Sequence, residues 1–260
     1  MPRLLNPFSL LERRVLFAPQ RDLRGTPEHV GLCYEDIFPV TTDGLRLHGW
    51  NMPGESDVVW IIFHGNGGNI SVRLDQYQEI QRRYGASVIA IDYRGYGLSE
   101  GVPSETGFYD DSLTTYRLVR QIYPQKKIVL FGRSMGGAVA AQLASVVSNA
   151  ALLLEASIAS IANVIREHAA WTRHVPISLL FRSKFDTQGY VASRAVPTLM
   201  LHGDCDRTVS YTNSERILSS VIGQKKLHIV TGGEHDGLDL VDPDEYHGVI
   251  SEFLSENGAL

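Results

Sequence analysis

The sequence is poor in cysteine, in long apolar runs and in positive charge. Its 260 residues include two cysteines, Cys33 and Cys205, which excludes a disulfide framework and a Cys-rich zinc module. No run approaches the roughly 20 apolar residues that a membrane-spanning helix needs. The 24 basic and 29 acidic residues give a net charge of −5, whereas nucleic-acid binding needs a basic surface. We therefore expect neither a membrane-spanning nor a nucleic-acid-binding protein.

The N-terminal segment comprises residues 1–33, and its first 19 residues have neither the apolar core nor the small-residue cleavage site of a signal peptide. With no export signal and two cysteines, the expected location is the cytoplasm. We expect part of this segment to form a short helix whose apolar face packs on the rest of the molecule. The residues of that face are Leu10, Leu11, Val15 and Leu16. The alternative is a weak contact with a membrane surface, in which arginines of the segment meet anionic lipid. Those arginines are Arg3, Arg13 and Arg14.

From residue 34 onward, apolar strand-like runs alternate with helix-like segments. Residues 34–40 and 45–51 flank a turn at 42–44 and predict an antiparallel hairpin. Six further strands are expected at 58–63, 87–91, 127–131, 150–154, 197–201 and 226–230. Helices are expected at 70–84, 104–123, 135–147, 210–221 and 243–255. This alternation predicts an α/β fold with a mostly parallel eight-stranded sheet and helices on both faces, forming one domain over residues 34–260.

Residues 157–194 break the alternation, because a stretch of about 40 residues carries no strand signal. A long insertion after the carboxyl end of a strand lies beside the ligand crevice of a parallel sheet. We therefore expect a short helical cap there. Its basic residues would suit an anionic head group or a membrane surface, and a solvated helix face is the alternative. They are Arg166, Arg173, Arg182, Lys184 and Arg194.

The pattern Gly-x-Ser-x-Gly occurs twice, and it is typical of a nucleophile elbow, a strand–turn–helix unit in which the serine stands clear of the sheet. The first match, residues 97–101, lies in a loop with no strand directly before Ser99. The second match, residues 132–136, follows the apolar run 127–131 and precedes an Ala-rich helical segment. This context predicts Ser134 as the nucleophile. The alternative is a helix-capping serine on a glycine-rich turn.

A serine nucleophile needs a base, normally histidine, and the histidine needs an orienting carboxylate. In this architecture the chain order is nucleophile, acid, histidine. Asp206 and His235 follow the last two expected strands, so both come at the sheet edge where Ser134 lies. We expect these three residues to form a catalytic triad. Asp204 is the alternative acid, and its other role would be to cap the turn.

The oxyanion that develops during acyl transfer needs two backbone N–H donors. One is expected from Met135, at the start of the helix after the nucleophile. The other is expected from the glycine-rich loop 64–69, with Asn66 as the first choice and Gly67 as the second; a generic tight turn is the alternative. Residues expected to line the substrate pocket come from these loops and from the cap. They are Gly65, Arg133, Trp171, Ile177 and Phe181, and simple packing is the alternative for the apolar ones.

Together these motifs resemble the α/β-hydrolase superfamily of serine hydrolases. They are HGNGGN at 64–69, DYRGYGLSEG at 92–101, GRSMGG at 132–137, HGDCDRTV at 202–209 and GGEHD at 232–236. Within the superfamily, the chain is similar to small-capped esterases and acyl-thioesterases that include the depalmitoylating α/β-hydrolase-domain proteins. By that resemblance Asp206 matches the acid position. The chain departs from these relatives at Arg133, where His or Gln is frequent, and it lacks the Cys-rich N-terminal segment of the mammalian depalmitoylases.

The resemblance implies a serine hydrolase that cleaves carboxylic esters or thioesters of small to medium acyl groups through an acyl-enzyme. It implies no metal and no organic cofactor, and the expected partner is a small-molecule ester or thioester. Two alternatives stay open. The same triad could cleave an amide, a lactone or a carbon–carbon bond, and the fold could serve a non-catalytic ligand-binding receptor or scaffold.

Overall fold

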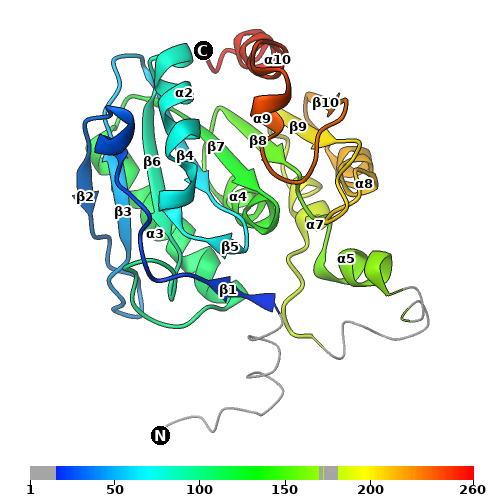
Figure 1. Cartoon of the computed structure of the whole chain (residues 1–260), viewed down its shortest axis with the longest axis horizontal. Helices are drawn as coiled ribbons and strands as arrows, with labels where there is room; N and C mark the ends of the chain where they lie inside the picture. Colours follow the sequence, from blue (N-terminus) through cyan, green and yellow to red (C-terminus); the bar gives the residue numbers. More distant parts are fainter. Residues whose placement is uncertain (1–15, 170–171, 173–180) are drawn as a thin grey trace, which may run out of the picture.

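The computed structural model describes residues 16–169, 172 and 181–260 (Figure 1). The expected N-terminal helix falls before this range except for Leu16, and the pocket candidates Trp171 and Ile177 also lie outside the described residues. Within that part of the chain, the expected α/β architecture is confirmed. An eight-stranded sheet runs in the order β10-β9-β8-β7-β4-β6-β3-β2.

The sheet is parallel except at one edge, where β2 and β3 form the expected hairpin and β3 pairs antiparallel with β6. The strands are β2 (Glu35–Ile37), β3 (His48–Met52), β4 (Val58–Phe63), β6 (Ser87–Asp92), β7 (Lys127–Arg133), β8 (Ala151–Glu155), β9 (Thr198–Gly203) and β10 (Lys225–Val230). A separate two-residue pair joins β1 (Ala18–Pro19) to β5 (Gly67–Gly68). This small pair fixes the segment before the sheet against the loop after β4.

Helices cover both faces of the sheet. The helices are α2 (Leu74–Tyr84), α3 (Glu105–Ile122), α4 (Met135–Val146), α5 (Ile161–His168), α7 (Thr187–Val191), α8 (Thr212–Ser220), α9 (Leu238–Val241) and α10 (Pro243–Glu256). Two 3₁₀ turns, η1 (Pro27–Val30) and η2 (Ile70–Arg73), precede α2. Local chemistry sets several ends: Ser104 Oγ accepts the Gly107 amide at the start of α3, and α2 ends at Gly85 with φ 58°.

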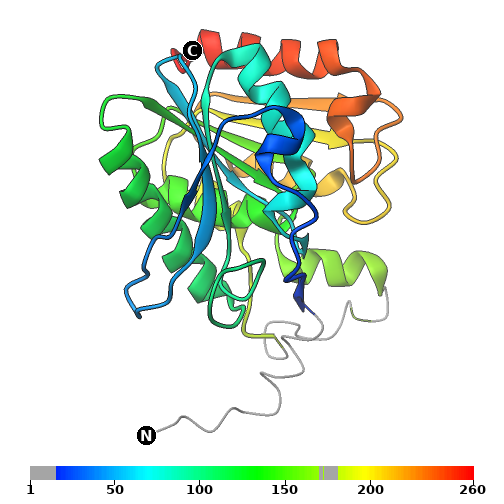
Figure 2. The same cartoon turned by 60° about the vertical axis from the view of Figure 1, so that its left-hand side comes forward.

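The core consists of two apolar layers, one on each face of the sheet. Along β4, Val59, Ile61 and Phe63 point to the layer under α3, α4, α7 and α8. Trp60 and Ile62 point to the layer under α2 and α10. Figure 2 shows α2 and α3 on opposite sides of the sheet. Burial on both faces explains why β4 is a continuous apolar run rather than an alternating one.

Of the expected cap over residues 157–194, residues 170–171 and 173–180 lie outside the described part of the chain. α5, at its start, packs on the outside of one core layer through the half-buried Ile161 and Val164 (Figure 1). Phe185 and Val191 are buried in the layer beside α4, and α7 packs on α4 and α8. The last part of the insertion therefore belongs to the core, because α7 fills the space next to the Ala-rich surface of α4.

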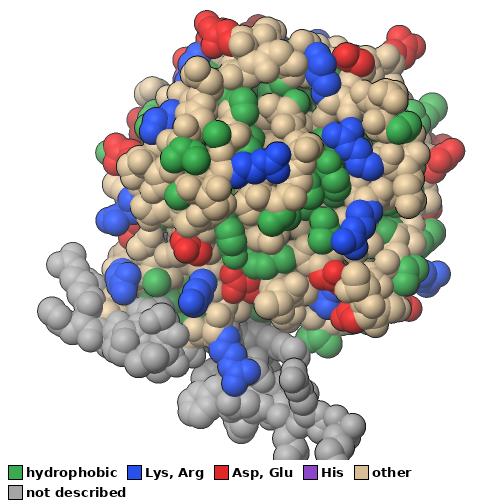
Figure 3. Space-filling model, turned by 180° about the vertical axis from the view of Figure 1, so that it is seen from behind, with side chains coloured by type: hydrophobic (Ala, Val, Ile, Leu, Met, Phe, Trp, Pro, Cys, Tyr) green, Lys and Arg blue, Asp and Glu red, His purple; other side chains and the backbone are tan. Residues whose placement is uncertain are grey.

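The face of the molecule seen from behind carries Lys and Arg side chains interspersed with Asp and Glu (Figure 3). Large exposed apolar side chains also occur, among them Ile122 at the end of α3 and Val146 at the end of α4. No helix in the described ranges is both long enough and apolar enough to cross a membrane.

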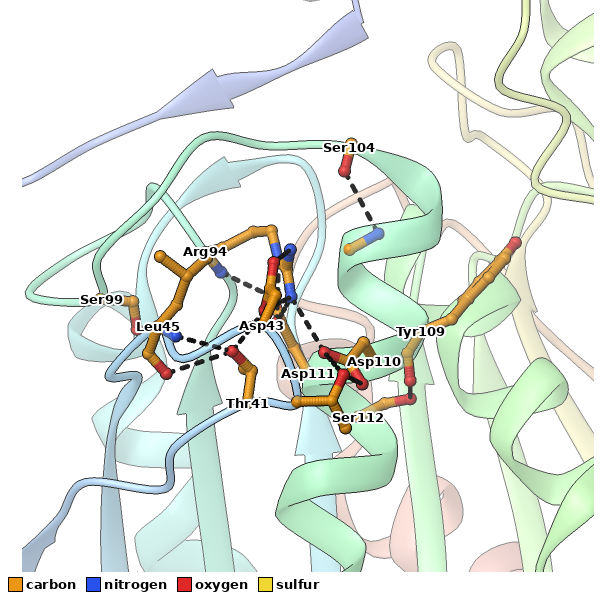
Figure 4. Close-up of polar contacts among 12 residues, drawn as sticks. Thr41, Asp43, Leu45, Arg94, Ser99, Ser104, Tyr109, Asp110, Asp111 and Ser112 are labelled. Atoms are coloured by element: carbon orange, nitrogen blue, oxygen red, sulfur yellow. Dashed lines mark hydrogen bonds and ion pairs between the residues drawn. The ribbon is translucent and has the colours of Figure 1, made fainter. Parts of the chain in front are cut away.

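The loop that follows β6, residues 93–104, is held by an arginine at its start (Figure 4). Arg94 donates from Nε and Nη2 to Asp111 Oδ1 of α3 at 2.9 and 2.7 Å, and its backbone amide donates to Asp111 Oδ2 at 2.8 Å. Its Nη1 donates to Asp43 Oδ2 at 3.0 Å, in the turn between β2 and β3. The guanidinium thereby ties the loop to α3 and to the hairpin.

Candidate active site

Ser134 occupies the sharp turn between β7 and α4, with φ 53° and ψ −119°. This backbone conformation is rare for a residue with a side chain and costs of the order of 1–3 kcal/mol. The two flanking glycines are needed because the turn is crowded. A Cβ on Gly132 would lie 2.4 Å from the Gly136 carbonyl oxygen, and one on Gly136 would lie 2.2 Å from the Phe63 carbonyl oxygen. The turn therefore has the geometry of a nucleophile elbow.

The structure brings Ser134, His235 and Asp206 together from three different loops. His235 Nε2 lies 3.2 Å from Ser134 Oγ, and His235 Nδ1 lies 2.7 Å from Asp206 Oδ2. The Asp206 side chain is fully buried, and the His235 side chain is 16% exposed. A carboxylate at Nδ1 keeps the ring proton on that nitrogen, so Nε2 presents its lone pair to the serine hydroxyl.

Asp206 is held by more groups than the sequence pattern indicated. Its Oδ1 accepts the amides of Thr208 and Val209, each at 2.8 Å, and its Oδ2 also lies 3.2 Å from His202 Nε2. Burial raises the pKa of Asp206, but the hydrogen bonds from His202, His235 and the Val209 amide lower it more, so its pKa lies well below the usual range. The carboxylate stays ionised beside His235.

Asp204, the alternative acid, has a different role in the structure. Its Oδ1 accepts the Gly232 amide at 2.7 Å and so joins the loops after β9 and β10. His202, in contrast, was not singled out by sequence reasoning. Its Nδ1 lies 2.7 Å from Ser214 Oγ, and its Nε2 lies 2.8 Å from the Val209 carbonyl oxygen as well as close to Asp206. Its place in the HGDCD motif, at the end of β9, is the signal that could have identified it.

The loop expected to provide the second oxyanion donor lies against the elbow. A Cβ on Gly65 would lie 3.4 Å from Ser134 Cβ. The Asn66 side chain supports the loop, because Oδ1 accepts the Ala18 amide at 3.1 Å and lies 3.1 Å from the Tyr96 hydroxyl. The backbone amides of Asn66 and Met135 donate to no other group within the described part of the chain. Both residues line the cavity beside Ser134.

Arg133, next to the nucleophile, is buried in a network of ion pairs. Its Nε lies 2.9 Å from Glu155 Oε1, and its Nη2 lies 2.6 Å from Asp236 Oδ1. The same nitrogen donates to the backbone carbonyl of His235, and Glu155 accepts from the Tyr246 hydroxyl. Arg133 therefore lines the cavity as expected, but its guanidinium is engaged in holding the loop that carries His235.

A cavity of about 730 Å³ opens beside Ser134 and His235. Its lining includes the expected Gly65 and Arg133, together with apolar residues of α5. Phe181 is described but does not line it. The chain beyond Phe181 follows α3 instead, because the amides of Lys184 and Phe185 donate to the Glu105 carboxylate. Across the described ranges, no three His, Cys, Asp or Glu side chains are grouped to hold a metal ion.

The strand order, the elbow and the loops at its edge define the protein as an α/β-hydrolase. Residues 54–190 match the family described as serine aminopeptidase, S33, and the chain belongs to this family of serine hydrolases. It is 31% identical to the uncharacterized protein MT2364 of Mycobacterium tuberculosis, covering 96% of this chain and 89% of that one. It is 32% identical to protein bem46 of Schizosaccharomyces pombe, covering 89% and 80%.

Solved structures agree with the fold. The Pyrococcus furiosus esterase Pf2001 superimposes with a TM-score of 0.77 at 22% identity, covering 92% of this chain and 98% of the esterase. An esterase from Exiguobacterium antarcticum gives a TM-score of 0.63 at 16% identity, covering 85% and 100%. At these identities the likeness establishes the shared fold.

Proposed function

We propose that this protein hydrolyses carboxylic esters or thioesters of small to medium acyl groups, with Ser134 as the nucleophile. The observation that carries the proposal is the position of His235, which lies 3.2 Å from Ser134 Oγ and 2.7 Å from Asp206 Oδ2. The same serine opens onto a partly apolar cavity. The esterases among the structural neighbours are consistent with a small-molecule ester as substrate.

In the first half of the cycle, His235 Nε2 takes the hydroxyl proton of Ser134 as Oγ attacks the carbonyl carbon. The carbonyl oxygen becomes an oxyanion, which the backbone N–H groups of Asn66 and Met135 stabilise. His235 then returns the proton to the leaving alkoxide or thiolate, the bond to the leaving group breaks, and the acyl group stays on Ser134.

In the second half, water enters where the leaving group stood. His235 takes a proton from this water, whose oxygen attacks the acyl carbonyl, and then returns a proton to Ser134 Oγ as the carboxylic acid departs. Asp206 stabilises the imidazolium in both halves without itself becoming protonated, which agrees with its low pKa. The reaction consumes one water and needs only the groups of this chain.

The cavity supports an acyl group of limited size. A volume of about 730 Å³ falls within the range that binds drug-sized molecules. Ile161, Val164 and Ile165 of α5 form an apolar side on which an acyl chain can pack.

The test is labelling with a fluorophosphonate probe, followed by turnover of p-nitrophenyl esters from acetate to palmitate and of a matched acyl-thioester. We expect wild-type protein and Ser134→Ala to differ completely in labelling, and the ester series to peak at one chain length. Aminoacyl p-nitroanilides belong in the same panel, and faster cleavage of these than of any ester would make amide hydrolysis the activity. A folded wild-type protein that neither reacts with the probe nor turns over any substrate would contradict the proposal.

A further inference from the structure

The cavity beside Ser134 has two chemically different walls. One wall is α5, whose cavity-lining residues Ile161, Val164, Ile165 and His168 follow the i, i+3, i+4, i+7 spacing of one helix face. Ile161 and Val164 are half-buried and pack against the core layer beside α4, and together with Ile165 they give the cavity an apolar side. Figures 1 and 2 show α5 and β1 at the same edge of the sheet, so the two can form walls of one cavity.

The other wall is formed by the segment after β1 and by η2, and it carries two arginines. Arg24 and Arg73 both line the cavity, together with Gln20. Arg73 Nη2 lies 3.0 Å from Asp236 Oδ1. The Arg24 guanidinium has no ion pair with any described residue, and its Nη2 lies 3.4 Å from Gln20 Oε1.

The acidic groups at this cavity do not neutralise the arginines. Asp236 is the one acidic residue among the described lining, and it is shared by Arg73 and Arg133. Glu155 pairs with Arg133 behind the elbow and is itself buried. Positive charge is therefore left at the side of Arg24 and Arg73, in a chain whose net charge is −5. Such local charge attracts an anionic ligand group.

We propose that the preferred substrates are amphiphilic esters or thioesters that carry an apolar acyl chain and, on the leaving group, a phosphate or carboxylate. This inference rests on the proposed hydrolase function. In an ester held with its carbonyl at Ser134, the acyl chain and the leaving group diverge from the carbonyl carbon. The acyl chain then packs along α5, and the anionic group reaches Arg24 and Arg73, whose guanidinium groups match such oxygens in pairs.

The chemistry balances as simple hydrolysis. The bond between the acyl carbon and the leaving oxygen or sulfur breaks, and the oxygen of water completes the carboxylic acid. The leaving alcohol or thiol takes up a proton from His235 and keeps its anionic group throughout. The arginines bind this group and do not enter the bond-making step.

The experiment compares decanoyl esters that share one acyl chain and one glycerol oxygen, each below its micelle concentration. They are decanoyl glycerol, its phosphate, its zwitterionic phosphocholine and the decanoyl ester of glycerate, which replaces phosphate by carboxylate. The readout is the ratio of kcat/KM for each charged ester to that for decanoyl glycerol. We expect a ratio of about ten or more for the phosphate, because a charge-assisted pair is typically worth at least this factor.

The variants are Arg24→Gln, Arg73→Gln and the double variant, with Arg216→Gln as the matched control. Arg216 is an exposed residue of α8 that does not line the cavity. We expect the double variant to bring the phosphate ratio close to one and the control to keep it. Raising the salt concentration should lower the wild-type ratio in the same direction, because salt screens partly exposed charges.

The possible results distinguish failure of the anionic-substrate inference from failure of the proposed hydrolase function. Hydrolysis of decanoyl glycerol with a phosphate ratio near one, unchanged in the arginine variants, would overturn the anionic-substrate inference and leave the esterase proposal standing. A high ratio for glycerate but not for phosphate would support the inference and narrow the anion to a carboxylate. Absence of both ester hydrolysis and probe labelling would overturn the proposed function itself.

Discussion

The sequence Gly-x-Ser-x-Gly occurs at Ser99 and at Ser134, and the two regions use it in opposite ways. Ser99 lies in the loop after β6 (Figure 4) and is fully buried. Its hydroxyl donates to the Asp92 carbonyl at 2.6 Å and accepts the His48 amide at 2.8 Å. Ser134 lies at the cavity, and its hydroxyl faces His235. The Ser99 hydroxyl is hydrogen-bonded inside the fold, whereas the Ser134 hydroxyl lies at the cavity.

The glycines of the two Gly-x-Ser-x-Gly segments also have different structural roles. Gly97 has φ 45°, and a Cβ there would lie 1.9 Å from Asp92 Oδ2, so this glycine lets the loop fold over a buried carboxylate. Gly132 instead lets β7 approach α4, and Gly136 lets α4 approach the end of β4, close to the strained serine. The five-residue pattern therefore indicates a crowded backbone. A nucleophile is indicated only when a strand precedes the pattern and a helix follows it.

The sharpest test of this comparison removes each hydroxyl in turn. Ser134→Ala should lower turnover on the order of 10⁴–10⁶-fold, because the loss of a nucleophile removes the acyl-enzyme route. Ser99→Ala should keep fluorophosphonate labelling and most of the turnover. Labelling kinetics and ester turnover, with far-ultraviolet circular dichroism to verify folding, give the measurement. Equal losses in the two variants would contradict the distinction.

The next largest effect is expected at Asp206. Asp206→Asn should lower kcat about 10³–10⁴-fold, because an amide no longer fixes the His235 tautomer. Since the pKa of Asp206 lies well below its usual range, the carboxylate is ionised wherever the protein is folded. The loss should therefore persist across the whole pH–rate profile, and recovery at high pH would argue against this role. Asp204→Asn is the matched control and should keep most of the activity.

The third prediction concerns the loop that contains Ser99 rather than Ser99 itself. Arg94→Met leaves the buried Asp111 without its charged partner and should lower the free energy of unfolding by about 3–5 kcal/mol, as urea denaturation measures. The double variant Arg94→Met with Asp111→Leu removes both charges and should recover part of the loss. A single variant as stable as wild type would show that the loop does not depend on this ion pair.

Ser99→Ala should have a smaller effect on stability than the arginine change. The His48 amide loses its acceptor in a buried position, which costs about 1–3 kcal/mol in the free energy of unfolding. Ser99→Cys, of similar shape and weaker hydrogen bonding, is a useful comparison. An unchanged urea midpoint in Ser99→Ala would mean that this hydroxyl is not a structural group.

The smallest effect is expected at the link between the two regions. The Tyr96 hydroxyl, from the loop of the first match, lies 3.0 Å from the Asn66 carbonyl oxygen and 3.1 Å from its Oδ1. Tyr96→Phe should lower kcat by about two- to tenfold with KM nearly unchanged, because the oxyanion loop loses one support. Tyr116→Phe, at a half-buried position of α3 that does not line the cavity, is the control. A KM effect alone would indicate a change in the cavity instead.

The sequence predicted the sheet well because most strands are buried on both faces and therefore appear as apolar runs. The expected strand 127–131 extends to Arg133 in the structure, where it pairs with Glu155 of β8. A charged pair at a strand end carries no hydrophobic signal, so this extension was hidden. Within the expected cap, α7 was not predicted as a separate helix, because its five residues are too few to show a helical period.

Site residues that lie far apart in the sequence could not be predicted to meet. Arg24 and Arg73 meet at the cavity only because β1 pairs with β5, and a two-residue pair has no recognisable pattern. The support that His202 gives to Asp206 depends on how the loop after β9 curls back. In contrast, Ser134, Asp206 and His235 were predicted to meet because each follows a strand that ends at one edge of the sheet.

The pairing of β1 with β5 makes the cavity wall depend on chain continuity at a position far from Ser134 in sequence. Ala18 donates to the Asn66 side chain, the Gln20 amide donates to the Gly68 carbonyl, and Arg24 belongs to the cavity wall. A single peptide-bond cleavage between residues 20 and 24 would leave the main sheet intact. It would nevertheless free the strand that pairs with Gly67 and Gly68, and the proposed oxyanion donor Asn66 would lose this support.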